Sequence, residues 1–357
     1  MDIKTLLFKM VELKSSDIHL AAGCPPLYRI DGRLVSIGMR TLSESDTKEM
    51  AYSMLNEFAQ SKFNSGAREL DFSFGIEKIG RVRANVHYQR GSVSVALRMI
   101  PIEIPKIHTL GLPSAVKNFS DYHQGLILVT GATGSGKSTT LASLIDMINS
   151  KYSQHIITVE DPIEFLHRNK KSLITQREVG MDTESFPNAL RSILRQDPDT
   201  VLIGEMRDLE TIQAALTIAE TGHLTFATLH TNSSVETITR IIDAFPPGQQ
   251  NQVSTQLSFV LQAVLCQQLL PKVNGGRILA TEVMIANSAI KNLVREGKPH
   301  QIQNIIQSNQ AETGMQTMNQ SLVSLYTQGL ITKNDAIQRS IDIQNFKKLI
   351  QEVETGL

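Results

Sequence analysis

Residues 126–138 read LILVTGATGSGKS, and this stretch decides how the rest of the chain is interpreted. An apolar run of strand length, 126–130, leads directly into 131–138, which is a complete GxxxxGK[ST] match, and a helical pattern follows over 139–148. This order predicts a phosphate-binding loop, because the glycines let backbone N–H groups converge on phosphate oxygens at the start of a helix. We therefore expect a nucleotide site in an α/β fold.

The loop and the first helical turn hold the predicted nucleotide contacts: Gly131, Ala132, Thr133, Gly134, Ser135, Gly136, Lys137, Ser138 and Thr139. We expect Lys137 to reach the β- and γ-phosphates and the Ser138 hydroxyl to bind Mg²⁺. A phosphate loop indicates nucleotide binding but not hydrolysis. The groups for hydrolysis must therefore come from the ends of the following strands.

Carboxylates follow two apolar runs downstream of the loop. HIITVEDPIE places Glu160, Asp161 and Glu164 after one run. TVLIGEMRD places Glu205 after the next, with Gly204 where an aspartate is common. Carboxylates beside a triphosphate hold Mg²⁺ or activate water, and we expect the metal at Ser138, Glu160, Asp161 and Glu205. Capping of a following helix is the alternative role for Glu160.

Histidines flank the next apolar run, HLTFATLH. His230 follows the run, at the same predicted sheet edge as the acids, and is a candidate γ-phosphate sensor. His223 precedes the run and is interpreted as structural or as lying at a subunit boundary. The same part of the chain offers Arg191, Arg195 and Arg207 as candidate cations for the transferring phosphoryl group.

The first hundred residues predict a small α+β unit. Apolar residues at helical spacing open it, and 42–63 returns to a helical pattern that Ser43 or Ser45 caps. Residues 80–100, GRVRANVHYQRGSVSVALRMI, alternate on both sides of Gln89-Arg90-Gly91 and predict a β-hairpin.

One face of this hairpin is basic and polar and carries Arg81, Arg83 and Arg98. Such a face is usually solvated, but it also suits contact with phosphate. The contact is expected either within the same chain or across a subunit boundary, and the second option predicts an oligomer.

Prolines punctuate 101–113, which we interpret as a linker. The predicted domains are an N-terminal α+β domain at 1–100 and a nucleotide-binding domain at 114–357. From 114 onward, strand-length apolar runs alternate with helical segments and predict a parallel sheet covered by helices. Beyond Pro246 we expect mostly helices.

The composition excludes several classes. Lys+Arg and Asp+Glu are both 35, so the formal net charge is +0 and there is no overall basic field for nucleic acid. Cys24 and Cys266 are isolated, which argues against structural zinc and disulfides. No apolar run has the ~18 residues of a membrane span, and the start MDIKTLLFKM lacks the layout of a signal peptide. We expect a cytoplasmic protein.

Several long motifs in order resemble one family, the secretion and pilus ATPases. They are SDIHLAAGCPPLYRIDG (16–32), GATGSGKST (131–139), TVEDPIEF (158–165), LIGEMRDLET (202–211), AETGHLTFATLHT (219–231) and GMQTMNQSL (314–322). The resemblance spans nearly the whole chain. It implies a PAS-like N-terminal α+β domain and a RecA-like P-loop ATPase domain with a helical C-terminal portion.

The resemblance also implies an activity. Members form hexameric rings that hydrolyse ATP with Mg²⁺ at the cytoplasmic face of the inner membrane and move an integral pilus platform protein. Carried over by motif, Glu164 is the water-activating base, Glu205 the Walker B acid and His230 the γ-phosphate contact. The family's arginines correspond to members of Arg81, Arg83 and Arg98.

Within the family, retraction of type IV pili and twitching motility is favoured, because extension and type II secretion members usually carry a tetracysteine zinc insertion. Residues 289–293 read AIKNL, where retraction members carry AIRNL; Lys291 keeps the charge but loses the planar guanidinium. An ordinary amphipathic helix is the alternative for this motif. The alternative functions are an accessory retraction paralogue, which is also a candidate partner, an extension or secretion ATPase, and a nucleic-acid translocase.

Overall fold

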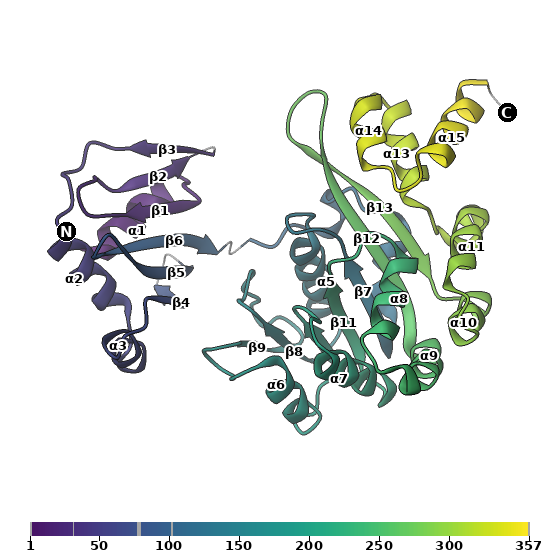
Figure 1. The fold of residues 1–357 in the computed structure, drawn as a ribbon, viewed down its shortest axis with the longest axis horizontal. Coiled ribbons are helices and arrows are strands. Elements are labelled where there is room, and N and C mark those ends of the chain that lie inside the picture. Colours follow the sequence, from purple (N-terminus) through teal and green to yellow (C-terminus); the bar gives the residue numbers. More distant parts are fainter. Residues whose placement is uncertain (1, 31, 77–79, 101–102, 356–357) are drawn as a thin grey trace. The chain divides into compact units, whose positions relative to one another are not determined.

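The computed structural model describes residues 2–30, 32–76, 80–100 and 103–355 and divides the chain into two compact units. The first unit is Met1–Glu103 with Glu164–Leu166, and the second is Ile104–Ile163 with His167–Leu357. Both mix helices with a sheet (Figure 1). Residues 101 and 102 of the predicted linker lie outside the described residues, and the predicted domain limits stay a prediction.

The first unit packs helices against one face of an antiparallel sheet, with the apolar faces of both forming its core. The helices are α1 (Ile3–Glu12), α2 (Glu44–Met54) and α3 (Glu57–Asn64). In spatial order, the described strands are β3 (Arg33–Ser36), β2 (Leu27–Ile30), β1 (Asp17–Leu20), β6 (Ser92–Ile100), β5 (Gly80–Gln89) and β4 (Glu69–Ile76).

The predicted hairpin at 80–100 is confirmed as β5 and β6, which pair from Gln89↔Ser92 outward. Its two-residue turn places Arg90 at φ 48° and Gly91 at φ 85°, the left-handed conformation that matches the twist of a tight hairpin. Val82, for example, is buried in the core, whereas Arg81 and Arg83 lie on the other face. The alternation of apolar and polar residues in the sequence therefore corresponds to the buried and the more exposed face of the sheet.

The helical pattern at 42–63 is two helices. Ser43 caps α2 in a capping box: its Oγ accepts from the backbone N–H of Asp46 (3.1 Å), and its own N–H donates to the Asp46 carboxylate (2.8 Å). The pattern divides between α2 and α3 because Leu55 is extended and Asn56 caps α3. Each helix thus starts at its own polar cap.

The second unit is built on a mainly parallel sheet. In spatial order, the described strands are β13 (Arg277–Ile285), β12 (Leu261–Pro271), β7 (Gly125–Thr130), β11 (Leu224–Leu229), β10 (Thr200–Ile203), β8 (His155–Glu160) and β9 (Leu173–Glu178). Neighbouring strands are parallel except β12 and β13, which form an antiparallel pair. All six residues of β7 are buried. The carboxyl ends of the parallel strands therefore meet at one edge.

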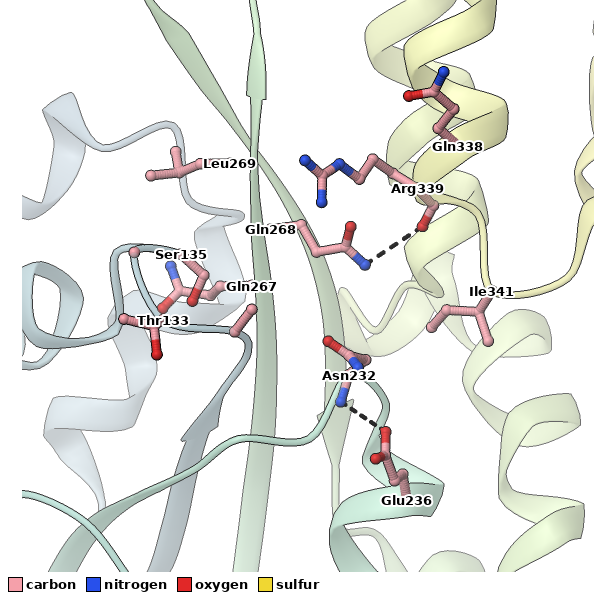
Figure 2. A pocket seen from close by; sticks show the side chains of 12 residues that line it. Thr133, Ser135, Asn232, Glu236, Gln267, Gln268, Leu269, Gln338, Arg339 and Ile341 are labelled. Carbon is pink, nitrogen blue, oxygen red and sulfur yellow. Dashed lines mark hydrogen bonds between the residues drawn. The ribbon is translucent and has the colours of Figure 1, made fainter.

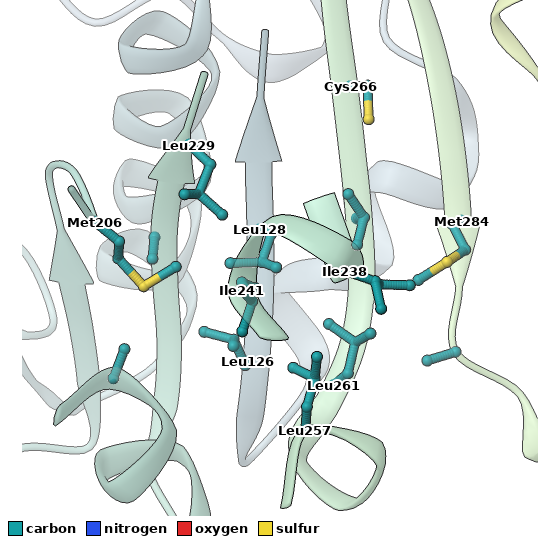
Figure 3. Packing of buried hydrophobic residues seen from close by; sticks show 14 of the residues in the cluster. Leu126, Leu128, Met206, Leu229, Ile238, Ile241, Leu257, Leu261, Cys266 and Met284 are labelled. Atoms are coloured by element: carbon teal, nitrogen blue, oxygen red, sulfur yellow. The ribbon is translucent and has the colours of Figure 1, made fainter. Parts of the chain in front are cut away.

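Helices cover both faces of this sheet. On one face α5 (Lys137–Lys151) packs with α4 (Ser114–Lys117) and the short helix Asn118–Asp121. The other face carries α6 (Phe186–Ile193), α7 (Leu209–Glu220), α8 (Ser234–Asp243) and α9 (Pro247–Val260). Figure 3 shows this second core, where Ile241 of α8 lies beside Leu126 and Leu128 of β7, and Ile238 lies near Met284 of β13.

The expectation of mostly helices beyond Pro246 is wrong for 261–285, which forms β12 and β13. Most of the apolar residues of β12 are buried, and the segment lacks the strict alternation of a half-buried strand. Periodicity alone therefore does not distinguish it from a buried helix. The segment is a strand because it pairs with β7. The chain after β13 is helical: α10 (Ser288–Arg295), α11 (Ile302–Ser308), α12 (Gln310–Thr313), α13 (Met318–Thr327), α14 (Lys333–Arg339) and α15 (Ile343–Thr355).

A fully buried carboxylate, Glu282, connects β13 to two helices. Its Oε1 accepts the backbone N–H of Ser234, the first residue of α8 (2.7 Å), and the N–H of Met318, the first residue of α13, also acts on it. Burial raises the pKa of Glu282, and these N–H groups act in the opposite direction. The N-terminus of α8 thus has a carboxylate acceptor from β13 inside the core.

No described helix is both long enough and apolar enough to cross a bilayer. Cys24 and Cys266 are both free thiols, and Cys266 is buried.

We predict that Ser43→Ala weakens the start of α2 by about 1 kcal/mol, because the capping box loses its side-chain acceptor. Amide hydrogen exchange of the full chain measures the effect as faster exchange in the first turn of α2. Ser45→Ala is the matched control, since the Ser45 hydroxyl bonds only the exposed Glu49 side chain. Equal exchange in the two variants would contradict the assignment of the cap.

Candidate functional site

The phosphate loop joins β7 to α5 and has no room for side chains at its first position. Gly131 (φ 139°), Gly134 (φ 80°) and Gly136 (φ 92°) all adopt left-handed backbone conformations. A Cβ on Gly131 would lie 2.3 Å from the backbone oxygen of Gln267 in β12. The loop is therefore pressed against the neighbouring strand, which fixes where its N–H groups point.

Lys137 lies across the mouth of this loop. Its ammonium donates to the backbone oxygens of Gly131 (2.7 Å) and Ala132 (3.1 Å). Among the described residues, the buried Ser135 Oγ has no hydrogen-bond partner. Because buried polar atoms are almost always paired, these groups are suited to a polar ligand seated in the loop.

Glu205 follows β10 by two residues and is the centre of a charged cluster. One carboxylate oxygen contacts both Arg207 Nε (2.7 Å) and His230 Nε2 (3.1 Å). Burial acts to raise the pKa of Glu205, but Arg207, His230 and Lys137 together outweigh burial and hold the pKa below its usual value. The predicted acid, histidine and lysine thus lie together at the carboxyl edge of the sheet.

Contacts between β10 and β11 set this geometry. Thr228 Oγ1 donates to the backbone oxygen of Gly204, and Met206 N–H donates to that of Thr228. A Cβ on Gly204 would lie 3.1 Å from Glu160 Cα. This close approach explains why glycine stands where an aspartate is common.

The acids after β8 have different surroundings. Glu160 accepts from Thr158 Oγ1 (2.7 Å) and Gln176 Nε2 (3.1 Å). No helix begins within 161–172, all of which are described, so the helix-capping alternative for Glu160 does not apply. Asp161 is exposed and lies close enough to Arg207 for its charge to raise the arginine's pKa, after the larger effect of Glu205.

Sequence reasoning missed Glu178. Its buried carboxylate accepts the backbone N–H of Ile163 (3.2 Å) and so holds the segment that carries Asp161. Glu178 lies at the end of β9, 15 residues further along the chain. In the sequence, the one signal for Glu178 is that it is an acidic residue at the end of a strand-length segment.

Four predicted residues belong to the first unit. Glu164 is exposed. Arg81 Nε donates to Ser73 Oγ (2.9 Å), and Arg98 Nε donates to Asp17 (2.7 Å). Arg83 is the cross-strand neighbour of Arg98.

The remaining candidates have structural contacts. Arg191 pairs with Glu210 on the surface (3.1 Å), and Arg195 is exposed. His223 contacts the backbone oxygen of Ile218 (3.0 Å) at the start of β11, in line with the structural role expected for it.

A pocket of about 430 Å³ borders the outer side of the phosphate loop. Thr133 and Ser135 form one wall, and Gln338 and Arg339 at the end of α14 form another (Figure 2). Gln268 of β12 crosses toward α14 and donates to the backbone oxygen of Arg339 (3.4 Å). The loop is thus bordered by the C-terminal helices on this side.

The donor set fits magnesium better than a transition metal. Across the described residues, no three His, Cys, Asp or Glu side chains come together as metal ligands, so Glu160, Asp161 and Glu205 do not form a preassembled site. Mg²⁺ typically takes one or two protein oxygens and completes its shell with phosphate and water. The Ser138 hydroxyl and the charged Glu205 carboxylate are oxygen donors of this kind.

A family model, two related sequences and a related structure each match most of this chain. The family model "Type II/IV secretion system protein" matches residues 2–274. The type IV pilus retraction ATPase PilT of Pseudomonas aeruginosa is 44% identical over 97% of this chain and 100% of its own length. A twitching motility protein of Neisseria gonorrhoeae is 45% identical over 92% and 89%. A crystal structure of the pilus retraction motor PilT with bound ADP is 52% identical, covers 98% and 99%, and has a TM-score of 0.92.

We predict that Gly131→Ala costs far more stability than Gly134→Ala. Both replacements strain a left-handed residue by about 1–2 kcal/mol, but only the first places a methyl group against Gln267, which adds about 1–3 kcal/mol. Hydrogen exchange of β7 and α5 measures the difference, and nucleotide titration reports loop function. Similar losses in the two variants would show that β12 does not constrain the loop.

Proposed function

We propose, because the chain belongs to the type II/IV secretion system protein family, that it is an ATP-hydrolysing motor that retracts type IV pili and drives twitching motility. The named relatives support this function, since a retraction ATPase and a twitching motility protein match it over nearly their full lengths. The retraction motor of known structure binds ADP, and ATP is the proposed substrate here.

One observation carries the proposal: Lys137, Glu205 and His230 gather at the ends of three neighbouring parallel strands. Lys137 follows β7, Glu205 follows β10, and His230 follows β11. A cation, an acid and a histidine beside a glycine loop are the groups that phosphoryl transfer to water requires.

In the proposed reaction, the β- and γ-phosphates replace the two backbone oxygens that now accept from Lys137. The loop N–H groups and the N-terminus of α5 bind the same phosphates. Ser138 and Glu205 hold Mg²⁺, which when bound neutralises phosphate charge. His230, held by Glu205, donates toward the γ-phosphate.

The carboxylates have separate proposed roles, in metal binding and in proton abstraction from water. Glu205 has a lowered pKa and two cationic neighbours, so it is a poor proton acceptor and is better suited to the metal. Glu160 is engaged by Thr158 and Gln176. We assign Glu164 as the base that takes a proton from the attacking water, and Asp161 as an outer carboxylate of the metal site.

Arginines of the first unit complete the proposed site across a subunit boundary in a homohexamer. In the second unit Arg207 is held by Glu205 and Arg191 by Glu210. By resemblance to the family, Arg81, Arg83 and Arg98 are the proposed cations for the transferring phosphoryl group. The ring acts at the cytoplasmic face of the inner membrane, on the pilus platform protein. A paralogous retraction ATPase is a second proposed partner, and nucleic acid is not one.

We predict that Glu164→Gln lowers kcat by about 100-fold or more while ATP affinity stays within about two-fold, because the amide cannot accept the proton. Glu205→Gln should instead raise the Mg²⁺ concentration needed for half-maximal rate. Steady-state hydrolysis and binding of a fluorescent ATP analogue separate the two effects. Retained turnover in Glu164→Gln moves the base to Glu205.

We predict that specific activity rises with assembly and that mixed rings recover activity. Arg83→Ala and Glu164→Gln are each expected to be slow alone. A mixed ring contains sites with an intact base and an intact arginine, so part of the rate returns. Hydrolysis measured against protein concentration, with size determination in parallel, checks both points. If mixing restores no activity and the specific activity does not depend on protein concentration, each site is complete within one chain.

A further inference from the structure

On the polar face of the first unit, one row of cross-strand neighbours combines a single carboxylate with three arginines. Asp17 opens β1, and its cross-strand neighbours are Arg29 in β2 and Arg98 in β6. Arg83 in β5 is directly opposite Arg98. Like charges at opposed positions repel, so this row places two arginines side by side with Asp17 as the adjacent negative charge.

Asp17 is the most enclosed member of the row. Its side chain is 10% exposed, whereas that of Arg98 is 67% exposed. One carboxylate oxygen accepts from Arg98 Nε (2.7 Å), and the other accepts from Ser16 Oγ (2.7 Å), with Arg29 Nε at 3.8 Å. Burial acts to raise the pKa of Asp17, but the bonds from Ser16 and Arg98 outweigh it and keep the pKa below its usual value.

The contact uses only the inner nitrogen of Arg98. Within the described residues, the hydrogen bond of Arg98 is made by Nε, and neither Nη atom makes one. A guanidinium has five N–H donors in a rigid plane, so fixing Nε fixes the direction of the four donors on Nη1 and Nη2. By contrast, the Arg40–Asp46 pair of the same unit is bidentate through both Nη atoms.

We propose that Asp17 is a positioning residue for hydrolysis: it holds Arg98 by Nε so that the two terminal nitrogens are presented to a phosphate group of the nucleotide. This inference rests on the proposed function, in which Arg98 acts on the transferring phosphoryl group. Asp17 itself touches no substrate. The alternative is an ion pair that only stabilises the sheet, as most half-exposed pairs do weakly.

The test is a double-mutant cycle in the assembled full-length protein. Asp17→Asn keeps shape and removes the charge, and we expect kcat to fall about 10-fold or more with KM for ATP changed less than about three-fold, because a misaimed cation fails mainly in the transition state. In the Arg98→Ala background, Asp17→Asn should change kcat less than about two-fold. Thermal unfolding and ring size are measured on every variant.

Asp46→Asn is the matched control, since Asp46 is 13% exposed and pairs with an arginine that is 55% exposed. It should lower stability without lowering kcat. If Asp17→Asn does not fold, Asp17→Glu keeps the charge while displacing the carboxylate, and the same loss of kcat is expected.

Four results overturn the proposal, and they are distinguishable. If the wild-type ring does not hydrolyse ATP, the proposed function fails as well. If Arg98→Ala turns over like wild type, the role of Arg98 fails. If Arg98→Ala is slow but Asp17→Asn is not, or if Asp17→Asn slows both backgrounds equally, Asp17 only stabilises the fold.

Discussion

The close packing of β7 between β11 and β12 is the constraint on which the site depends. β7 is buried along its whole length, and the loop that follows it approaches Gln267 so closely that only glycine fits at residue 131. The Gln267 side chain in turn donates to Thr140 of α5 (2.9 Å). β12 therefore constrains β7, the loop and α5 together. The carboxyl ends of the other parallel strands lie at the same sheet edge as this loop.

Local patterns in the sequence predicted local structure well. The glycine loop, the Arg90–Gly91 hairpin and the clustering of Glu205 with His230 each follow from a short motif and from strand ends meeting at one edge. β12 and β13 were not predictable, because neither alternates strictly between apolar and polar residues, and a largely buried segment of this kind cannot be told from a helix by periodicity. The role of Asp17 depends on a partner 81 residues away, which no local pattern records.

The two units use charge in the same way. In the second unit, the Glu205 carboxylate fixes His230 and Arg207; in the first, Asp17 fixes Arg98 and lies beside Arg29. In both, a partly buried acid with a lowered pKa holds a more exposed cation. A neutral chain thus carries directed positive charge locally, and it does so without the overall basic field that would attract nucleic acid.

The buried Glu282 has a consequence for how the chain tolerates mutation over evolutionary time. It accepts the backbone N–H of the first residue of α8, so an apolar replacement leaves that buried donor unpaired. Substitutions at the start of α8, shortly after His230, and in β13 therefore constrain each other, although 48 positions separate Ser234 from Glu282 in the sequence.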